Sequence, residues 1–137
     1  MANGGWYGTQ DEWEQAERPL PTLDPIFYQF AVDHGFKLSK NGKDWPERSL
    51  RTDMPLSSLL QVFRVNLDND AWNVWAVCSQ DRGAERYWKQ QMIAQDITGE
   101  DLTARLNVLL EQGLQRLITW NARPEELEFA TKIGGSS

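Results

Sequence analysis

Two runs of strand-forming residues on either side of a short Asp/Asn turn constrain the fold of this chain more than any other feature. Residues 59–67 and 71–79 are rich in β-branched, aromatic and leucine side chains, and residues 68–70 read Asp-Asn-Asp. Such runs around a short turn predict an antiparallel hairpin. In the second run, apolar residues occupy both alternating sets: Trp72, Val74, Ala76 and Cys78 in one, Trp75 and Val77 beside Asn73 in the other. We therefore predict that residues 71–79 form a central strand covered on both faces.

Further strands are predicted on both sides of this hairpin. Residues 36–39 alternate, Asn41-Gly42 is typical of a tight turn, and residues 45–51 return as an edge or irregular strand because of Pro46. A turn over residues 80–83 precedes another strand at residues 85–94. A weak alternation at Leu127, Phe129 and Ile133 suggests one added edge strand. The prediction is a meander of four to five antiparallel strands.

Two helices are predicted before the sheet. Thr9 and Glu12 have the spacing of a capping box, and the short helix that follows should end before Pro19. Asp24-Pro25 has the form of an N-cap followed by the first helical residue, and Gly35 supplies a stop, which predicts a second helix at about 25–34.

A long amphipathic helix is predicted between Thr98 and Pro124, with a continuous leucine stripe that faces a core. Gly113 lies within that stripe, where it would allow a close approach to the sheet. The chain is thus expected to be α+β, a two-layer sandwich with N-terminal helices and a long C-terminal helix packed on one sheet face. We expect one domain over residues 1–133 and a flexible tail at 134–137.

Composition and charge exclude several classes of function. The 137 residues carry a net charge of −6, which argues against general binding to nucleic acid or to an anionic membrane. The charge is uneven, since residues 36–95 have nine bases and seven acids while residues 1–35 have six acids and one base. No apolar run reaches the roughly 20 residues of a membrane span, the first residues do not resemble a signal peptide, and there is a single cysteine. We therefore expect a cytoplasmic protein without membrane contact.

The sequence offers few candidates for catalysis or metal binding. It has neither of the common glycine-rich phosphate motifs, and one His and one Cys are too few for a zinc site. Asp68, Asp70 and Asp81 could bind a cation, but we favour a turn-forming role for them. His34 could act as a base for Cys78 or a serine, yet its place before Gly35 favours capping of a helix end, and Cys78 reads as a buried small apolar residue. We expect no metal and no cofactor.

The most suggestive pattern is a mixture of Trp and Arg within residues 45–88. Trp and Arg are enriched at the energetic centres of protein interfaces. Arg64 lies between Phe63 and Val65. If the helices cover the sheet face that carries Phe63 and Val65, Arg64 should point to the open face. The alternative is an aromatic core with Arg stems lying over it. The candidate ligand- or partner-binding residues are Trp45, Arg48, Arg64, Trp75, Arg86 and Trp88.

These observations favour a non-catalytic protein-binding module, of the inhibitor, immunity or adaptor type, over an enzyme. A second interpretation is a binder of a small anionic ligand, or a simple enzyme acting on one, at the Trp/Arg face. A third is a homodimer that buries the sheet face. The expected partner is therefore another protein or a second copy of this chain.

Overall fold

The computed structural model describes residues 9–40, 45–64 and 68–133, which form three α-helices, one 3-10 helix and a six-stranded antiparallel sheet. The predicted turn at Asn41-Gly42 and the tail at 134–137 lie outside the described residues. The elements are α1 (Gln10–Glu17), α2 (Leu20–His34), β1 (Lys37–Ser39), β2 (Glu47–Asp53), β3 (Ser57–Phe63), β4 (Trp72–Arg82), β5 (Glu85–Ile97), α3 (Gly99–Asn121), η1 (Pro124–Glu126) and β6 (Glu128–Lys132).

The strands lie in the sheet in the order in which they occur in the chain, β1 to β6. The predicted α+β class and antiparallel meander are confirmed, but the sheet has six strands and not four to five. The sixth is β6, which pairs with the first residues of β5. Its apolar alternation is weak because β6 is an edge strand with mostly exposed side chains.

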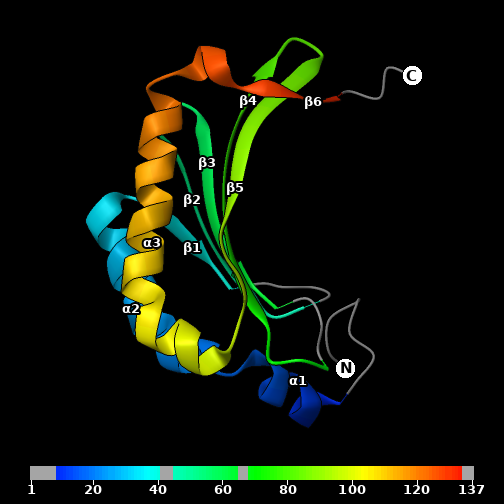
Figure 1. The fold of residues 1–137 in the computed structure, drawn as a ribbon, viewed down its shortest axis with the longest axis vertical. Helices are drawn as coiled ribbons and strands as arrows, with labels where there is room; N and C mark the ends of the chain where they lie inside the picture. The colour runs from blue at the N-terminus through cyan, green and yellow to red at the C-terminus, as the bar shows by residue number, and fades with distance from the viewer. Residues whose placement is uncertain (1–8, 41–44, 65–67, 134–137) are drawn as a thin grey trace.

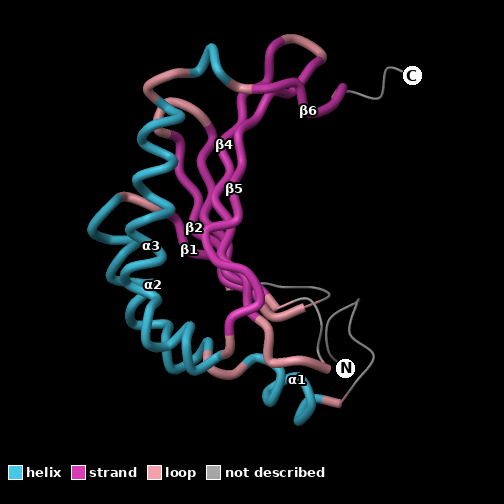
Figure 2. Tube along the Cα trace, viewed as in Figure 1, coloured by secondary structure: helices cyan, strands magenta, loops and turns pink. Residues whose placement is uncertain are grey.

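The helices cover one face of the sheet and leave the other open (Figure 1). Helix α3 packs against β3, β4 and β5, while α2 packs against β1 and β2. The sheet is bent, so that its open face is concave, with β6 and the tip of the β4–β5 hairpin at one end and α1 at the other (Figure 2). In the described part of the chain, no helix is long and apolar enough to cross a membrane.

Strand β4 lies between β3 and β5, as its two-sided apolar pattern predicts. Its first set of side chains faces the helices and is completely buried: Trp72, Val74, Ala76 and Cys78 are each 0% exposed. Its second set, Asn73, Trp75 and Val77, alternates with the first and faces the open side. The core therefore fills the space between β4 and α3, where it also includes leucines of α3 such as Leu106, Leu109 and Leu110.

Helix α2 begins at Leu20, five residues before the predicted start at Pro25. Pro21 lies in the first turn, where a missing N–H costs no intrahelical bond, so the helix can form through it. Leu20, Leu23 and Phe27 are buried at helical spacing, and that burial stabilises the extra turn despite Pro25 inside the helix. Asp24 is consequently not an N-cap.

The N-terminus of α3 is tied to the turn before β4. The Thr98 hydroxyl accepts from the backbone N–H of Asp101 at 3.0 Å and caps the helix. The Asp70 carboxylate accepts from the Gly99 N–H at 3.0 Å and from the Trp72 indole N–H at 3.1 Å. Asp70 therefore acts in local structure, in agreement with the turn role predicted for it.

Strand β5 is irregular beyond its middle. Its pairing with β4 shifts register twice, between Trp75 and Val74 and again between Val74 and Trp72. Asp96 has a φ of 56°, and its N–H donates to the Asn73 side chain at 3.1 Å. Strand β6 pairs only with residues 85–88, so in the described chain the outer edge of β5 has no partner strand from Lys89 onward.

Candidate functional site

The open face of the sheet brings together residues from β2, β3, β4 and β5 through their register. Arg51 on β2 lies opposite Leu59 on β3, and Leu59 lies opposite Val77 on β4. One row further along, Ser79 lies between Ser57 on β3 and Trp88 on β5. A cavity of about 220 Å³ opens here, lined by Arg51, Ser57, Leu59, Trp75, Val77, Ser79, Arg86, Trp88, Ala130 and Thr131.

The floor of this cavity is apolar. Trp75 precedes Val77 by two residues on β4, and Trp88 lies opposite Ser79, two residues after Val77, so the two indoles lie on either side of Val77. Val77 is 8% exposed, whereas Trp75 and Trp88 are half-buried and keep part of their rings in contact with solvent. We call the group formed by Leu59, Trp75, Val77 and Trp88 the tryptophan floor.

A second cavity of about 310 Å³ adjoins the first and is more polar. The two share Arg51, Ser57, Ser79 and Arg86, and the second adds Pro55, Leu56, Gln80 and Asp81. The site therefore changes from aromatic at one end to hydroxyl, amide and charged groups at the other.

Arg86 and Asp81 form a paired charge at this polar end. The Arg86 Nε and Nη2 donate to the two Asp81 carboxylate oxygens at 2.7 and 3.3 Å. The hydrogen bond from Arg86 lowers the pKa of Asp81 and, reciprocally, the bond to Asp81 raises the pKa of Arg86. Both groups stay ionised at neutral pH, and their charges largely cancel.

Arg51 is the arginine of the site that has no ion-pair partner among the described residues. Its side chain is exposed, and among the described residues it makes no ion pair or side-chain hydrogen bond. Its neighbour in register is the exposed Lys37 on β1, which adds positive charge on the same side of the sheet. The exposed Asp53, two residues along β2, lies opposite Ser57 on the same face, although it lines neither cavity itself.

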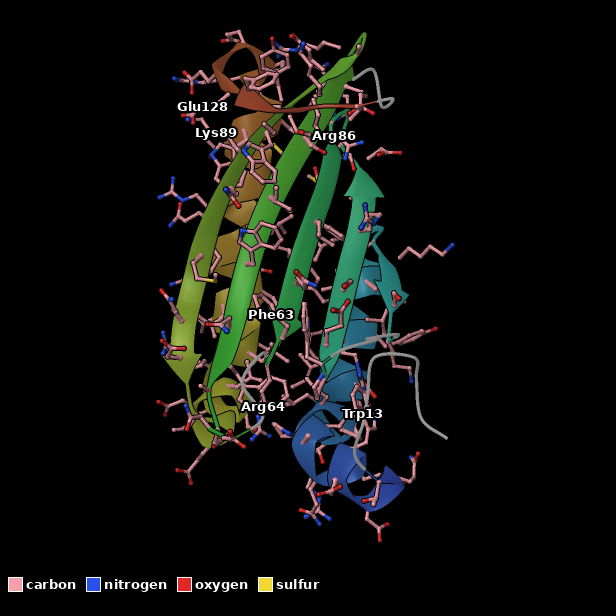
Figure 3. All side chains as sticks on the ribbon, turned by 90° about the vertical axis from the view of Figure 1, so that its right-hand side faces the viewer. Trp13, Phe63, Arg64, Arg86, Lys89 and Glu128 are labelled. Atoms are coloured by element: carbon pink, nitrogen blue, oxygen red, sulfur yellow. The ribbon has the colours of Figure 1, made fainter. Side chains whose placement is uncertain are left out.

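Three of the six residues predicted from the sequence, Trp75, Arg86 and Trp88, line this one cavity (Figure 3 labels Arg86). Arg51 belongs to the Trp/Arg-rich segment but was not among the predicted six. Val77 could have been found by its alternation with Trp75 on β4. Leu59, Ser57 and Ser79 had no distinctive signal, since only the strand register places them beside the two indoles.

Arg48 lies in the core layer, away from the open face. It is 3% exposed, and its guanidinium donates to both carboxylate oxygens of Asp24 at 2.7 and 3.2 Å and to Glu17 at 3.5 Å. The arginine thus links β2 to α1 and α2.

Arg64 also lies away from the cavity of the open face. Strand β3 ends at Phe63, and the side chains that face the helices are Leu60 and Val62, so the condition under which Arg64 would point to the open face is not met. Phe63 lies on the open face, while Arg64 lies at the opposite end from Arg86 (Figure 3). Its guanidinium donates to the backbone carbonyls of Ala16 and Asn69.

Trp45 lies just before β2 and does not line either cavity of the open face. It is half-buried, and its buried indole N–H has no hydrogen-bond partner among the residues that the structure describes. Of the six predicted residues, Trp45, Arg48 and Arg64 therefore do not line this cavity.

The structure places the remaining reactive groups apart from this site. His34 lies in the last turn of α2, as predicted; its Nε2 lies 3.5 Å from Glu111 Oε2 on α3, and its ring packs on Phe30. Burial raises the pKa of the Cys78 thiol to about 11, so it is not a thiolate at neutral pH. Within the described ranges, no three His, Cys, Asp or Glu side chains are grouped in a way that could hold a metal ion.

Comparison of the chain with protein-family models, with curated proteins and with solved structures finds no match in any of the three. The geometry of the open face is therefore the basis for any functional interpretation.

Proposed function

We propose that this protein is a non-catalytic binding protein that holds a segment of another protein against the open face of its sheet. The observation that supports the proposal is the tryptophan floor, a half-exposed aromatic cavity bordered by Arg51 and Arg86. Half-buried indoles on a rigid sheet offer a large contact area at little conformational cost, which is typical of the residues that dominate interface energetics.

Two further apolar side chains lie on the open face beyond the cavity. Met92 lies opposite Trp75 and is 38% exposed, and Phe63 lies on the same face toward the other end of the sheet (Figure 3). Exposed apolar residues that form a contiguous patch often mark an interaction surface. The concave shape suits a convex loop, turn or helix of a partner.

A small anionic ligand is the second candidate, and the polar cavity supports it. Ser57, Ser79 and Arg51 together present two hydroxyls and a guanidinium without an acidic partner in the described chain. Such a ligand would use the polar end and leave the tryptophan floor empty, whereas a protein segment would cover both.

Site-directed photo-crosslinking distinguishes the candidates. A benzophenone side chain replaces Met92 on the open face in one variant and Tyr28, 64% exposed on α2, in the control variant. After irradiation in a lysate of the cells of origin, we expect a protein adduct at position 92 that is absent at position 28. The adduct should disappear when Trp75→Ala and Trp88→Ala are added.

The crosslinking experiment can also support the homodimer or contradict the proposal. A crosslink between two copies of this chain at position 92 would support the homodimer instead. Equal labelling at positions 92 and 28, or labelling that survives loss of both tryptophans, would contradict the proposal.

A further inference from the structure

We infer that the tryptophan floor receives an aromatic side chain of the partner segment, and that a carboxylate beside that side chain pairs with Arg51. This inference rests on the proposed function and specifies the chemistry of the segment that the open face recognises.

The size and lining of the cavity favour an aromatic side chain. A cavity of about 150 Å³ lined by apolar residues is large enough to bind benzene. The cavity here measures about 220 Å³, which leaves room for a phenyl or phenol ring and part of its backbone. The faces and edges of Trp75 and Trp88 can then meet the incoming ring in stacked or edge-to-face contact, arrangements that add to the free energy of burial.

The charges at the border decide which aromatic segment is preferred. Two tryptophans alone would also attract a cation through their π faces. Arg51 and Arg86 oppose a cation, however, and Asp81 neutralises only Arg86. Arg51 has no ion-pair partner among the described residues, and Lys37 across the β1–β2 pair adds positive charge beside it, although the exposed Asp53 lies opposite Ser57 on the same face.

A carboxylate next to the bound ring would contact the Arg51 guanidinium. Guanidinium groups bind carboxylates through two parallel N–H···O bonds, which fixes orientation as well as charge. Ser57 and Ser79 lie between the two arginines and can donate to the same group. The recognised segment is thus an aromatic residue flanked by Asp or Glu.

Three short peptides test the inference: Ac-Asp-Phe-Asp-NH₂, its neutral isostere Ac-Asn-Phe-Asn-NH₂, and Ac-Asp-Ala-Asp-NH₂. Acid on both sides of Phe makes the result independent of chain direction. Binding is followed in NMR spectra by the indole N–H signals of the protein, assigned with Trp75→Phe and Trp88→Phe. We expect the acidic Phe peptide to bind about fivefold more tightly than the amide peptide, the upper range for one partly exposed ion pair, and the Ala peptide to bind least.

Two variants locate the charge effect. Arg51→Gln should remove the preference for the acidic peptide while the Phe peptide still binds more tightly than the Ala peptide. Arg105→Gln, an exposed position on α3, is the matched control and should leave the preference unchanged. Circular dichroism of both variants checks that the fold is retained.

Each contrary result has its own meaning. Equal affinity for the acidic and amide Phe peptides, or a preference that survives Arg51→Gln, overturns the role of the carboxylate but leaves an aromatic-binding face. No difference between Phe and Ala peptides overturns the whole inference. If the crosslink at position 92 still depends on the tryptophans in that case, the proposed function stands without this specificity.

Discussion

The Cδ2 atom of Leu60 lies 2.5 Å from the point where a Cβ would stand on Gly113. Helix α3 therefore approaches β3 more closely at this position than any side chain would permit, as expected from the place of Gly113 within the leucine stripe. Leu60 is completely buried, so its methyl groups cannot turn away without displacing other core residues.

Gly113→Ala should destabilise the protein although alanine is the better helix former. The gain in helix propensity is about 1 kcal/mol, whereas overpacking a tight core costs roughly 1–3 kcal/mol. We expect a net loss of about 1 kcal/mol in the free energy of unfolding, measured by urea denaturation. Adding Leu60→Val should recover part of it, and two independent, additive losses would show that the contact with Leu60 is not the cause.

Trp72 and Trp88 should differ strongly in their contribution to stability. Trp72→Ala removes a completely buried ring and should cost about 3–5 kcal/mol. Trp88 is half-buried on the open face, so Trp88→Ala should cost less than half as much. Thermal or urea unfolding of the two variants gives the comparison. Similar losses would mean that Trp88 belongs to the core and not to a binding surface.

The Arg48–Asp24 pair should behave as a buried ion pair. Arg48→Met leaves the Asp24 carboxylate without its two charge-assisted hydrogen bonds, and losses of about 3–5 kcal/mol follow when one partner of a fully buried pair is removed. Asp24 is 22% exposed, so we expect the lower end of this range or less. In a double-mutant cycle, Arg48→Met with Asp24→Asn should cost less than the two single losses added together; simple additivity would show that the pair is not coupled.

The buried Cys78 thiol should make the protein sensitive to alkaline pH. Its folded-state pKa, about 11, lies above the ordinary value of 9.0 because burial disfavours the thiolate. Folding therefore keeps the thiol protonated, and the associated stability is complete below about pH 9 and is lost as the pH rises toward 11. Cys78→Ala should flatten this limb of the stability profile. A thiol reagent should react with the wild-type protein at pH 8 only after unfolding, and rapid labelling of the folded protein would contradict the assignment.

The parts of the fold that were predictable from the sequence are those with a strong local pattern. The two-sided apolar pattern around Trp72 and Trp75 identified β4 as central, and the leucine stripe identified α3. The start of α2 was missed because Asp24-Pro25 resembles a helix start, although Leu20, Leu23 and Phe27 already had helical spacing. The face of β3 that the helices cover was not predictable from the sequence, because Leu59 and Leu60 supply apolar side chains to both alternating sets.

The candidate site depends on relations that no local pattern contains. Trp75, Arg86 and Trp88 were singled out by residue type, but their common cavity with Arg51 follows from the register of four strands. That register depends on every turn and bulge between them, including the shifts beside Val74. Arg48 and Arg51 both belong to the Trp/Arg-rich segment, so the sequence does not distinguish them. Only the burial of Arg48 against Asp24 shows that it has a structural role.

The irregular half of β5 has a consequence for the behaviour of the protein in concentrated solution. A straight strand edge with free N–H and C=O groups is a template on which other chains can add as further strands and aggregate. Along the part of β5 beyond its pairing with β6, two register shifts and the left-handed Asp96 interrupt the regular spacing of the backbone N–H and C=O groups. We expect these backbone distortions to make this edge, which no described strand covers beyond residue 88, a poor template for fibril growth.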